Sequence, residues 1–275
     1  MSGESDDFAR FERESWERAA GHYETVWSGL TRPFIPHLLE AAHVTQGTHV
    51  LDVACGPGFV AEAALALGAD PVGVDLTPEM IRQARERLPE IEFRQGDAQA
   101  LEFEDNTFDA VAMNFGVLHL PDPEAAFAEA LRVLRPGGHY GFTVWARPEQ
   151  SPGARIVEEA VESHADRSVE LPQGPDFFGY GDPEESRRVL GQVGFDPASL
   201  EFRTVTVEWT VPTATYLFEA ERDHGVRTGA LLAVQSPEVL DAIRRQIEES
   251  VQAYARGEGF ALPYAAHVVA ATANK

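Results

Sequence analysis

A glycine turn and three aspartates are spaced along the first hundred residues in a way that suits nucleoside binding. Gly56 and Gly58 stand in the turn that follows the apolar run Val50–Val53, and without side chains they let backbone N–H groups approach a ligand. A carboxylate at the end of an apolar run can accept hydrogen bonds from ribose hydroxyls or an amino group. The carboxylates in such places are Asp52, Asp75 and Asp97.

These residues need strands and helices in alternation to bring them together. The predicted strands are Val50–Val53, Pro71–Asp75, Ile91–Gln95, Phe108–Asn114 and His139–Trp145, and the predicted helices between them are Val60–Leu67, Pro78–Leu88 and Pro123–Leu134. Such alternation at short spacing predicts an α/β fold with a doubly wound, mostly parallel sheet. In such a sheet ligands bind beyond the carboxyl ends of the strands, where the glycines and aspartates stand.

The spacing of the turn leaves two classes of enzyme open. Gly56, Gly58 and Ala61 satisfy the pattern G-x-G-x-x-G/A, and Asp75 stands where a dinucleotide fold has its ribose-binding acid. A nicotinamide-dependent dehydrogenase and a methyltransferase both fit this corner.

The surrounding motifs separate the two classes. They are D-V-A-C-G-P-G at Asp52–Gly58, G-V-D-L-T-P-E-M-I at Gly73–Ile81, G-D-A at Gly96–Ala98, N-F-G-V-L-H-L-P-D-P at Asn114–Pro123 and L-R-P-G-G at Leu134–Gly138. In this order they resemble the class I S-adenosylmethionine-dependent methyltransferases, and within them the small-molecule subgroup similar to the ubiquinone/menaquinone C-methyltransferases. The resemblance covers about Val50 to Trp145 and implies a seven-stranded Rossmann-like sheet.

The resemblance also implies roles for individual residues toward S-adenosyl-L-methionine. The turn would face the methionyl part, Asp75 the ribose, Leu76 and Met80 the adenine, Asp97 the adenine amino group, and Asn114 the region below the sulfur. Tyr23 resembles the tyrosine of an N-terminal lid. The expected cofactor-binding residues are Tyr23, Asp52, Ala54, Gly56, Gly58, Asp75, Leu76, Met80, Asp97, Ala98 and Asn114.

The flanks are assigned by the same resemblance. We expect an N-terminal helical lid over residues 1–46, a Rossmann-like core over residues 47–212 and 262–275, and a helical substrate cap over residues 213–261, inserted before the last strand. Aromatic residues beyond Ala146 suggest an apolar acceptor pocket under the cap. Its candidate lining residues are Phe177, Phe178, Tyr180 and Tyr216.

Methyl transfer from a sulfonium asks little acid–base chemistry of the protein, because the methyl group is already electrophilic and the reaction depends mainly on positioning. A general base is needed only where the acceptor must lose a proton. His119, after the predicted fourth strand, is the candidate catalytic base, and structural packing is the alternative role. The acceptor is expected to be a small, natural-product-like molecule with an oxygen, carbon or nitrogen nucleophile.

Composition excludes several function classes. A net charge of −23 opposes binding to nucleic acid. Lys275 is the single lysine, so a Schiff base, a Walker A loop and a Tyr-x-x-x-Lys dehydrogenase site have no lysine in place. Cys55 is the single cysteine, and the histidines lack paired ligand spacing, so no metal is expected. With no apolar segment long enough to cross a bilayer and no apolar signal core, the expected location is the cytoplasm.

Two alternatives stay open beside the methyltransferase. An NAD(P)-dependent oxidoreductase would use the same glycine corner, although it would not require Gly96-Asp97-Ala98. A cofactor-binding homologue without catalysis would keep the same motifs. The sequence does not indicate an oligomeric state.

Overall fold

The computed structural model describes residues 2–169 and 171–275; residues 1 and 170, which fall within the predicted lid and core ranges, lie outside this description. The chain divides into two compact units, each described by itself below. The core unit comprises Thr31–Trp145, Gly174–Val205 and Ala266–Lys275. The accessory unit comprises Met1–Leu30, Ala146–Gln173 and Thr206–Ala265.

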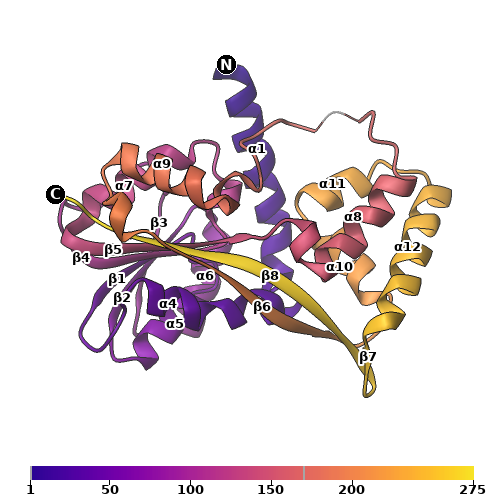
Figure 1. The fold of residues 1–275 in the computed structure, drawn as a ribbon, viewed down its shortest axis with the longest axis horizontal. Helices are drawn as coiled ribbons and strands as arrows, with labels where there is room; N and C mark the ends of the chain where they lie inside the picture. The colour runs from indigo at the N-terminus through magenta and orange to yellow at the C-terminus, as the bar shows by residue number, and fades with distance from the viewer. Residues whose placement is uncertain (1, 170) are drawn as a thin grey trace. The chain divides into compact units, whose positions relative to one another are not determined.

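The strands form a single mixed sheet (Figure 1). Its main path has the order β3-β2-β1-β4-β5-β8-β6, and the short β7 pairs with β8 off this path. β1 to β5 run parallel to one another, and β8 is antiparallel to β5. The bounds are β1 His49–Val53, β2 Asp70–Asp75, β3 Glu92–Gln95, β4 Phe108–Asn114, β5 Leu134–Trp145, β6 Glu201–Val211, β7 Ala255–Arg256 and β8 Gly259–Thr272. The predicted doubly wound, mostly parallel fold is confirmed.

Helices cover both faces of the sheet within the core unit. In Figure 1, α4 and α5 lie on one face and α7 and α9 on the other. The bounds are α4 Ile35–Ala41, α5 Phe59–Ala66, α6 Pro78–Arg87, α7 Pro123–Val133 and α9 Pro183–Val193. The short α3, Ser28–Thr31, has three of its four residues in the accessory unit. Pro stands in the first turn of α4, α6, α7 and α9, where its missing N–H costs no hydrogen bond. These helices bury the apolar strands on both sides, as a parallel sheet requires.

The two sides of the sheet bury separate apolar clusters. The larger joins β4 and β5 to α7 and α9, and Phe127, Tyr140 and Phe142 are among its fully buried side chains. The smaller joins the start of α5 to α6 and β3 and includes Cys55 and Phe93. Cys55 is a free, buried thiol.

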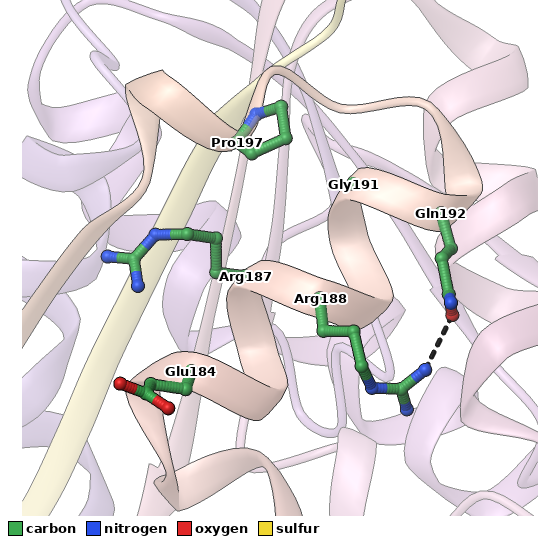
Figure 2. A pocket seen from close by; sticks show the side chains of 6 residues that line it. All are labelled: Glu184, Arg187, Arg188, Gly191, Gln192 and Pro197. Carbon is green, nitrogen blue, oxygen red and sulfur yellow. Dashed lines mark hydrogen bonds between the residues drawn. The ribbon is translucent and has the colours of Figure 1, made fainter.

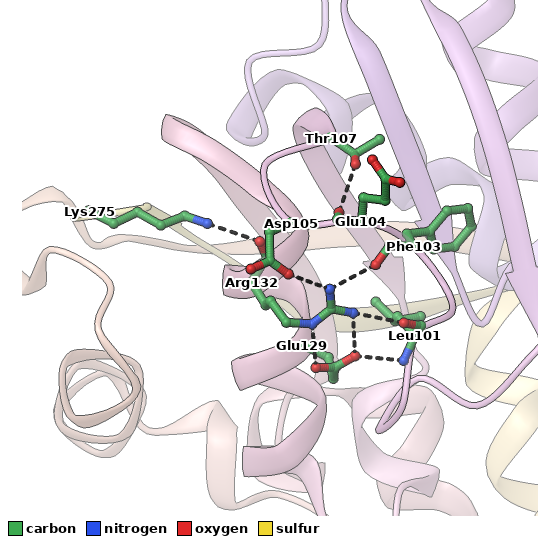
Figure 3. A network of polar contacts seen from close by, with 8 residues as sticks. All are labelled: Leu101, Phe103, Glu104, Asp105, Thr107, Glu129, Arg132 and Lys275. Atoms are coloured by element: carbon green, nitrogen blue, oxygen red, sulfur yellow. Dashed lines mark hydrogen bonds and ion pairs between the residues drawn. The ribbon is translucent and has the colours of Figure 1, made fainter.

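Arg132 on α7 fastens the loop that follows β3. Its guanidinium donates to Glu129, to Asp105 and to the carbonyls of Leu101 and Phe103, at 2.7 to 2.8 Å (Figure 3). Glu129 also accepts the N–H of Leu101 at 2.7 Å. A planar guanidinium serves such a set of acceptors at once, so the loop beyond Asp97 is held against α7.

The accessory unit is mainly helical. Its helices are α1 Ser2–Ala19, α2 Tyr23–Val26, α8 Pro152–His164, α10 Tyr216–His224, α11 Arg227–Leu232 and α12 Pro237–Val251. Trp209 lies at the centre of an aromatic cluster, with ring centroids 5.8 Å from those of Trp27, Tyr216 and Tyr264. Among the described residues, no helix combines the length and apolarity that crossing a bilayer requires.

Helices from the predicted lid and cap share this unit. The Tyr216 hydroxyl donates to the Thr25 carbonyl at 3.3 Å, the Trp27 indole N–H donates to the His224 carbonyl at 3.1 Å, and Arg227 lies 3.5 Å from Glu12. The same unit takes in α8, which the sequence analysis placed in the core. The unit boundaries therefore differ from the predicted ranges at residues 31–46, 146–173, 206–212 and 262–265.

Candidate cofactor site

The glycine turn connects β1 to α5 through left-handed backbone conformations. Ala54, Gly56 and Gly58 have φ values of +54°, +53° and +83°. A Cβ on Gly58 would lie 2.7 Å from Cζ of Phe93, so both its backbone conformation and its packing exclude a side chain. Because Gly58 is the residue before α5, the turn directs the first N–H groups of that helix toward the carboxyl edge of the sheet.

Asp52 is a buried carboxylate under this turn. Its Oδ2 accepts the N–H of Ala61 at 3.0 Å, whereas its Oδ1 is buried without a hydrogen-bond partner among the described residues. Burial raises the pKa of Asp52 well above its usual value, and the nearby Asp75 carboxyl adds to the rise. A cationic group placed beside Oδ1 would favour the ionised form.

Asp75 ties the end of β2 to the glycine turn. Its Oδ2 accepts the N–H of Gly56 and its Oδ1 accepts the N–H of Thr77, both at 2.8 Å. Burial raises the pKa of Asp75, and these two backbone hydrogen bonds oppose the rise. Each carboxylate oxygen has a further lone pair, so a diol could still bind here. Met80 is buried, with its sulfur 3.9 Å from where a Cβ on Gly56 would stand, and Leu76 is exposed.

Asp97 stands in the loop after β3. Its Oδ1 accepts both the backbone N–H of Gln99 at 2.9 Å and the side-chain amide of Gln99 at 3.0 Å. Oδ2 takes part in neither bond and is available to a ligand. The neighbouring Gly96 N–H donates to the carbonyl of Asp75 at 3.0 Å, so the ends of β2 and β3 are joined directly. Ala98 is buried and contributes to the large core cluster.

The end of β4 is held by a residue of β5. Asn114 is partly buried, and Phe115 after it has a left-handed φ of +58°, a conformation that costs energy for an aromatic residue. The hydroxyl of Thr143 accepts the N–H of Phe115 and donates to Oδ1 of Asn114, each at 2.8 Å. The Phe115 ring stacks on Trp145, with centroids 3.9 Å apart. These contacts compensate for the strained turn.

Only some of the residues expected to form the catalytic base and the acceptor pocket lie close to one another. His119 is in the short 3-10 helix after β4, and its ring lies 6.5 Å from Phe177, which meets Phe178 edge to face at 5.0 Å. Tyr180, expected in the pocket, packs against the core rings of Phe127 and Phe142.

The remaining expected site residues belong to the accessory unit. Tyr216 contacts Trp209 there, and Tyr23 lies 5.9 Å from Trp16, ring to ring. Tyr23 and Tyr216 therefore pack against aromatic residues of the accessory unit.

Two arginines lie beside the start of α5. Arg32 and Arg87 both place their guanidinium groups over the ring of Phe59, at 4.5 and 4.1 Å, and both pair with Glu62. Arg87 also donates to the carbonyl of Pro57 at 3.0 Å. Arg87 therefore supports the glycine turn, and both cations are engaged with protein groups.

A separate open hollow of about 490 Å³ lies along α9 and is lined by Glu184, Arg187, Arg188, Gly191, Gln192 and Pro197 (Figure 2). Arg188 donates to Gln192 within it. In the part of the chain that the structure describes, no three His, Cys, Asp or Glu side chains gather as metal ligands would.

Thr143 and the strained Phe115 were not identified from the sequence. The signal was Thr143, the one hydroxyl residue in the otherwise apolar run Gly141–Trp145, but its partners lie 28 and 29 residues earlier in the sequence. Only the pairing of β4 with β5, which sets Asn114 opposite Thr143, brings them together.

Comparison with known proteins agrees with the motif order. Residues 51–142 match the family described as Methyltransferase domain. The chain is 36% identical over 148 residues to a demethylmenaquinone methyltransferase of Renibacterium salmoninarum, a match that covers 52% of this chain and 62% of that protein. It is 36% identical over 146 residues to an uncharacterized protein of Mycobacterium tuberculosis, covering 52% and 53% respectively. The chain thus matches between about half and three fifths of the length of these relatives.

A solved structure shares the fold over most of the chain. Phosphoethanolamine N-methyltransferase 2 of Haemonchus contortus, in complex with phosphomonomethylethanolamine and S-adenosylhomocysteine, superposes with a TM-score of 0.56. The match covers 96% of this chain and 60% of that one, at 21% identity.

Proposed function

Because residues 51–142 of this chain belong to the methyltransferase domain family, we propose that the protein transfers a methyl group from S-adenosyl-L-methionine to a small organic acceptor. One observation carries the proposal. Asp52, Asp75 and Asp97 stand at the carboxyl ends of three adjacent parallel strands, beside a left-handed glycine turn. An adenosyl amino acid offers the hydroxyls, amino groups and cationic charge that such carboxylates bind.

Each of the three carboxylates beside the glycine turn is suited to a different part of this cofactor. Asp75 has lone pairs for a ribose diol, and Asp97 has Oδ2 for an adenine amino group. The unpartnered Oδ1 of Asp52 suits the ammonium group, because a cation nearby offsets the cost of burying a carboxylate. The expected roles of Ala54, Leu76, Met80, Ala98 and Asn114 are part of the same proposal.

The bound cofactor supplies an electrophilic methyl group, and the protein supplies position and exclusion of water. His119 takes the proton from an acceptor that must lose one, with Phe177 and Phe178 lining the acceptor side. The predicted lid, residues 1–46 with Tyr23, and the predicted substrate cap, residues 213–261, are part of the same proposal. The demethylmenaquinone methyltransferase similarity makes aromatic quinols the first acceptors to test.

Isothermal titration calorimetry tests the cofactor assignment. Wild-type protein should bind S-adenosylhomocysteine and should not bind NAD or NADP. Asp97→Asn should weaken binding about tenfold, because one hydrogen bond to a charged acceptor is lost while Oδ1 keeps its bonds to Gln99.

The matched control is Asp70→Asn, an exposed carboxyl at the opposite end of β2, which should bind like wild type. Binding of NAD in place of S-adenosylhomocysteine would replace the proposal with the oxidoreductase. If the cofactor binds and no acceptor in a broad panel gains a labelled methyl group, the non-catalytic homologue is favoured.

A further inference from the structure

The fully buried hydroxyl of Thr143 on β5 has its hydrogen bonds fixed by its surroundings. The N–H of Phe115 can only donate, so the Thr143 oxygen accepts there, at 2.8 Å. Among the described residues the hydroxyl proton has one other neighbour to bind, the Asn114 side chain at 2.8 Å. Because leaving a buried hydroxyl proton unpaired is costly, the Asn114 atom that faces Thr143 is the carbonyl oxygen.

This bond orients the carboxamide of Asn114. With Oδ1 taken by Thr143, the NH₂ group points the other way, and one of its hydrogens reaches the carbonyl of Thr31 at a long 3.4 Å. The second hydrogen has no bond to the described part of the chain. Asn114 therefore presents a donor, rather than an acceptor, at the carboxyl end of β4.

The charge around the glycine corner indicates which ligand group needs that donor. The carboxylates of Asp52, Asp75 and Asp97 can bind hydroxyl, amino or ammonium groups, but they repel an anion. The arginines nearest the turn, Arg32 and Arg87, are engaged with Glu62. An anionic oxygen of a ligand must therefore find neutral N–H donors.

We propose that Thr143 is a positioning residue that holds the Asn114 amide as a donor to the carboxylate of the amino-acid part of the bound cofactor. The inference rests on the proposed function, because it requires an adenosyl amino acid in the site. Thr143 itself does not contact the ligand. It acts by fixing the orientation of Asn114 and the left-handed turn at Phe115.

Calorimetry with two probes tests this role. S-Adenosylhomocysteine carries the carboxylate of the amino-acid part. 5′-Methylthioadenosine lacks both this carboxylate and the α-amino group, but it keeps the adenine and the ribose. Thr143→Val removes the hydroxyl while nearly keeping the shape, and we expect S-adenosylhomocysteine to bind about tenfold more weakly. The affinity for methylthioadenosine should change less than about twofold. Thr143→Ser, which keeps the hydroxyl, should restore binding of S-adenosylhomocysteine.

Asn114→Asp provides a second variant that can still accept the Thr143 proton. It offers no donor and adds a negative charge, so we expect a loss of about a hundredfold for S-adenosylhomocysteine and a much smaller one for methylthioadenosine. The control is Ser186→Ala, which removes another fully buried hydroxyl of the core unit, bonded to the Tyr180 carbonyl at 2.8 Å. It should change neither affinity.

The outcomes separate the inference from a purely structural role. If Thr143→Val binds S-adenosylhomocysteine like wild type, or weakens both probes in the same proportion, Thr143 does not position a donor for the carboxylate. If wild-type protein fails to bind S-adenosylhomocysteine at all, the proposed function is wrong and the inference is lost with it. A selective loss in Thr143→Val with rescue in Thr143→Ser supports the inference.

Discussion

Replacing Glu221 with glutamine should make the protein more stable above neutral pH. Glu221 lies on α10, and its carboxyl is folded against the turn into α11, with Oε2 2.8 Å from where a Cβ on Gly225 would stand. Burial raises the pKa of Glu221 to about 7, against a small opposing effect of a hydrogen bond with Thr228. Tyr264 lies close enough for the Glu221 charge to raise the phenol pKa further. The folded protein therefore disfavours the ionised carboxyl.

The size of the effect follows from proton linkage. A shift from 4.5 to about 7 is roughly 2.5 pKa units, each equivalent to about 1.4 kcal/mol, which gives about 3.5 kcal/mol as an upper bound. Residual access of water to the side chain reduces this to about 2 kcal/mol. The raised pKa contributes stability that is fully present below pH 4.5. This contribution is lost as the pH rises from 4.5 to about 7, because the unfolded chain then releases a proton that the folded protein still holds.

Urea unfolding at a series of pH values from 4.5 to 8.5 measures this contribution. The unfolding free energy of Glu221→Gln minus that of wild type should rise by about 2 kcal/mol between pH 4.5 and pH 8.5. The control is Glu219→Gln, an exposed carboxyl on the same helix, whose difference from wild type should stay flat. A pH-independent difference for Glu221→Gln would refute the burial argument.

Three further predictions follow from described contacts. Cofactor binding should release protons at pH values where Asp52 of the free protein is protonated, because the ligand's ammonium group favours the ionised carboxylate. Calorimetry in two buffers of different ionisation enthalpy, repeated over a series of pH values, should show this release in wild type and not in Asp52→Asn. Arg132→Lys should lower the unfolding free energy by about 1 to 2 kcal/mol in urea, since an ammonium cannot span the acceptors of Figure 3; an unchanged midpoint would contradict this. Gly153→Ala should cost about 1 to 3 kcal/mol, because the new Cβ would lie 2.1 Å from the Tyr264 ring, whereas Gly21→Ala meets nothing within 4 Å and should be neutral in thermal unfolding.

The sequence predicted the elements around the cofactor corner closely. The predicted fourth strand, Phe108–Asn114, coincides with β4, and the predicted helix Pro78–Leu88 extends one residue past α6. β4 is a short, largely apolar run, and α6 begins at a Pro after the N-cap residue Thr77, so the local pattern is sufficient to define both. The parallel order then placed Asp52, Asp75 and Asp97 at one edge.

What sequence could not predict depends on contacts between distant residues. Tyr180 was expected in a pocket because aromatic residues are frequent after Ala146, but only the packed structure shows its ring against Phe127. Thr143 acquires its role from strand pairing, and Glu221 acquires its raised pKa from burial. Neither burial nor strand register is encoded in the type or spacing of the residue itself.

The hydrogen bonds that Asp75 makes to Gly56 and Thr77 affect the rate and the entropy of ligand binding. Since these bonds exist within the protein alone, the loop is already rigid, and its loss of conformational freedom belongs to folding. Ligand association should then need no slow step in which this loop becomes ordered. Mutations that make the loop still more rigid should therefore improve the affinity little, because binding costs little loop entropy in the first place.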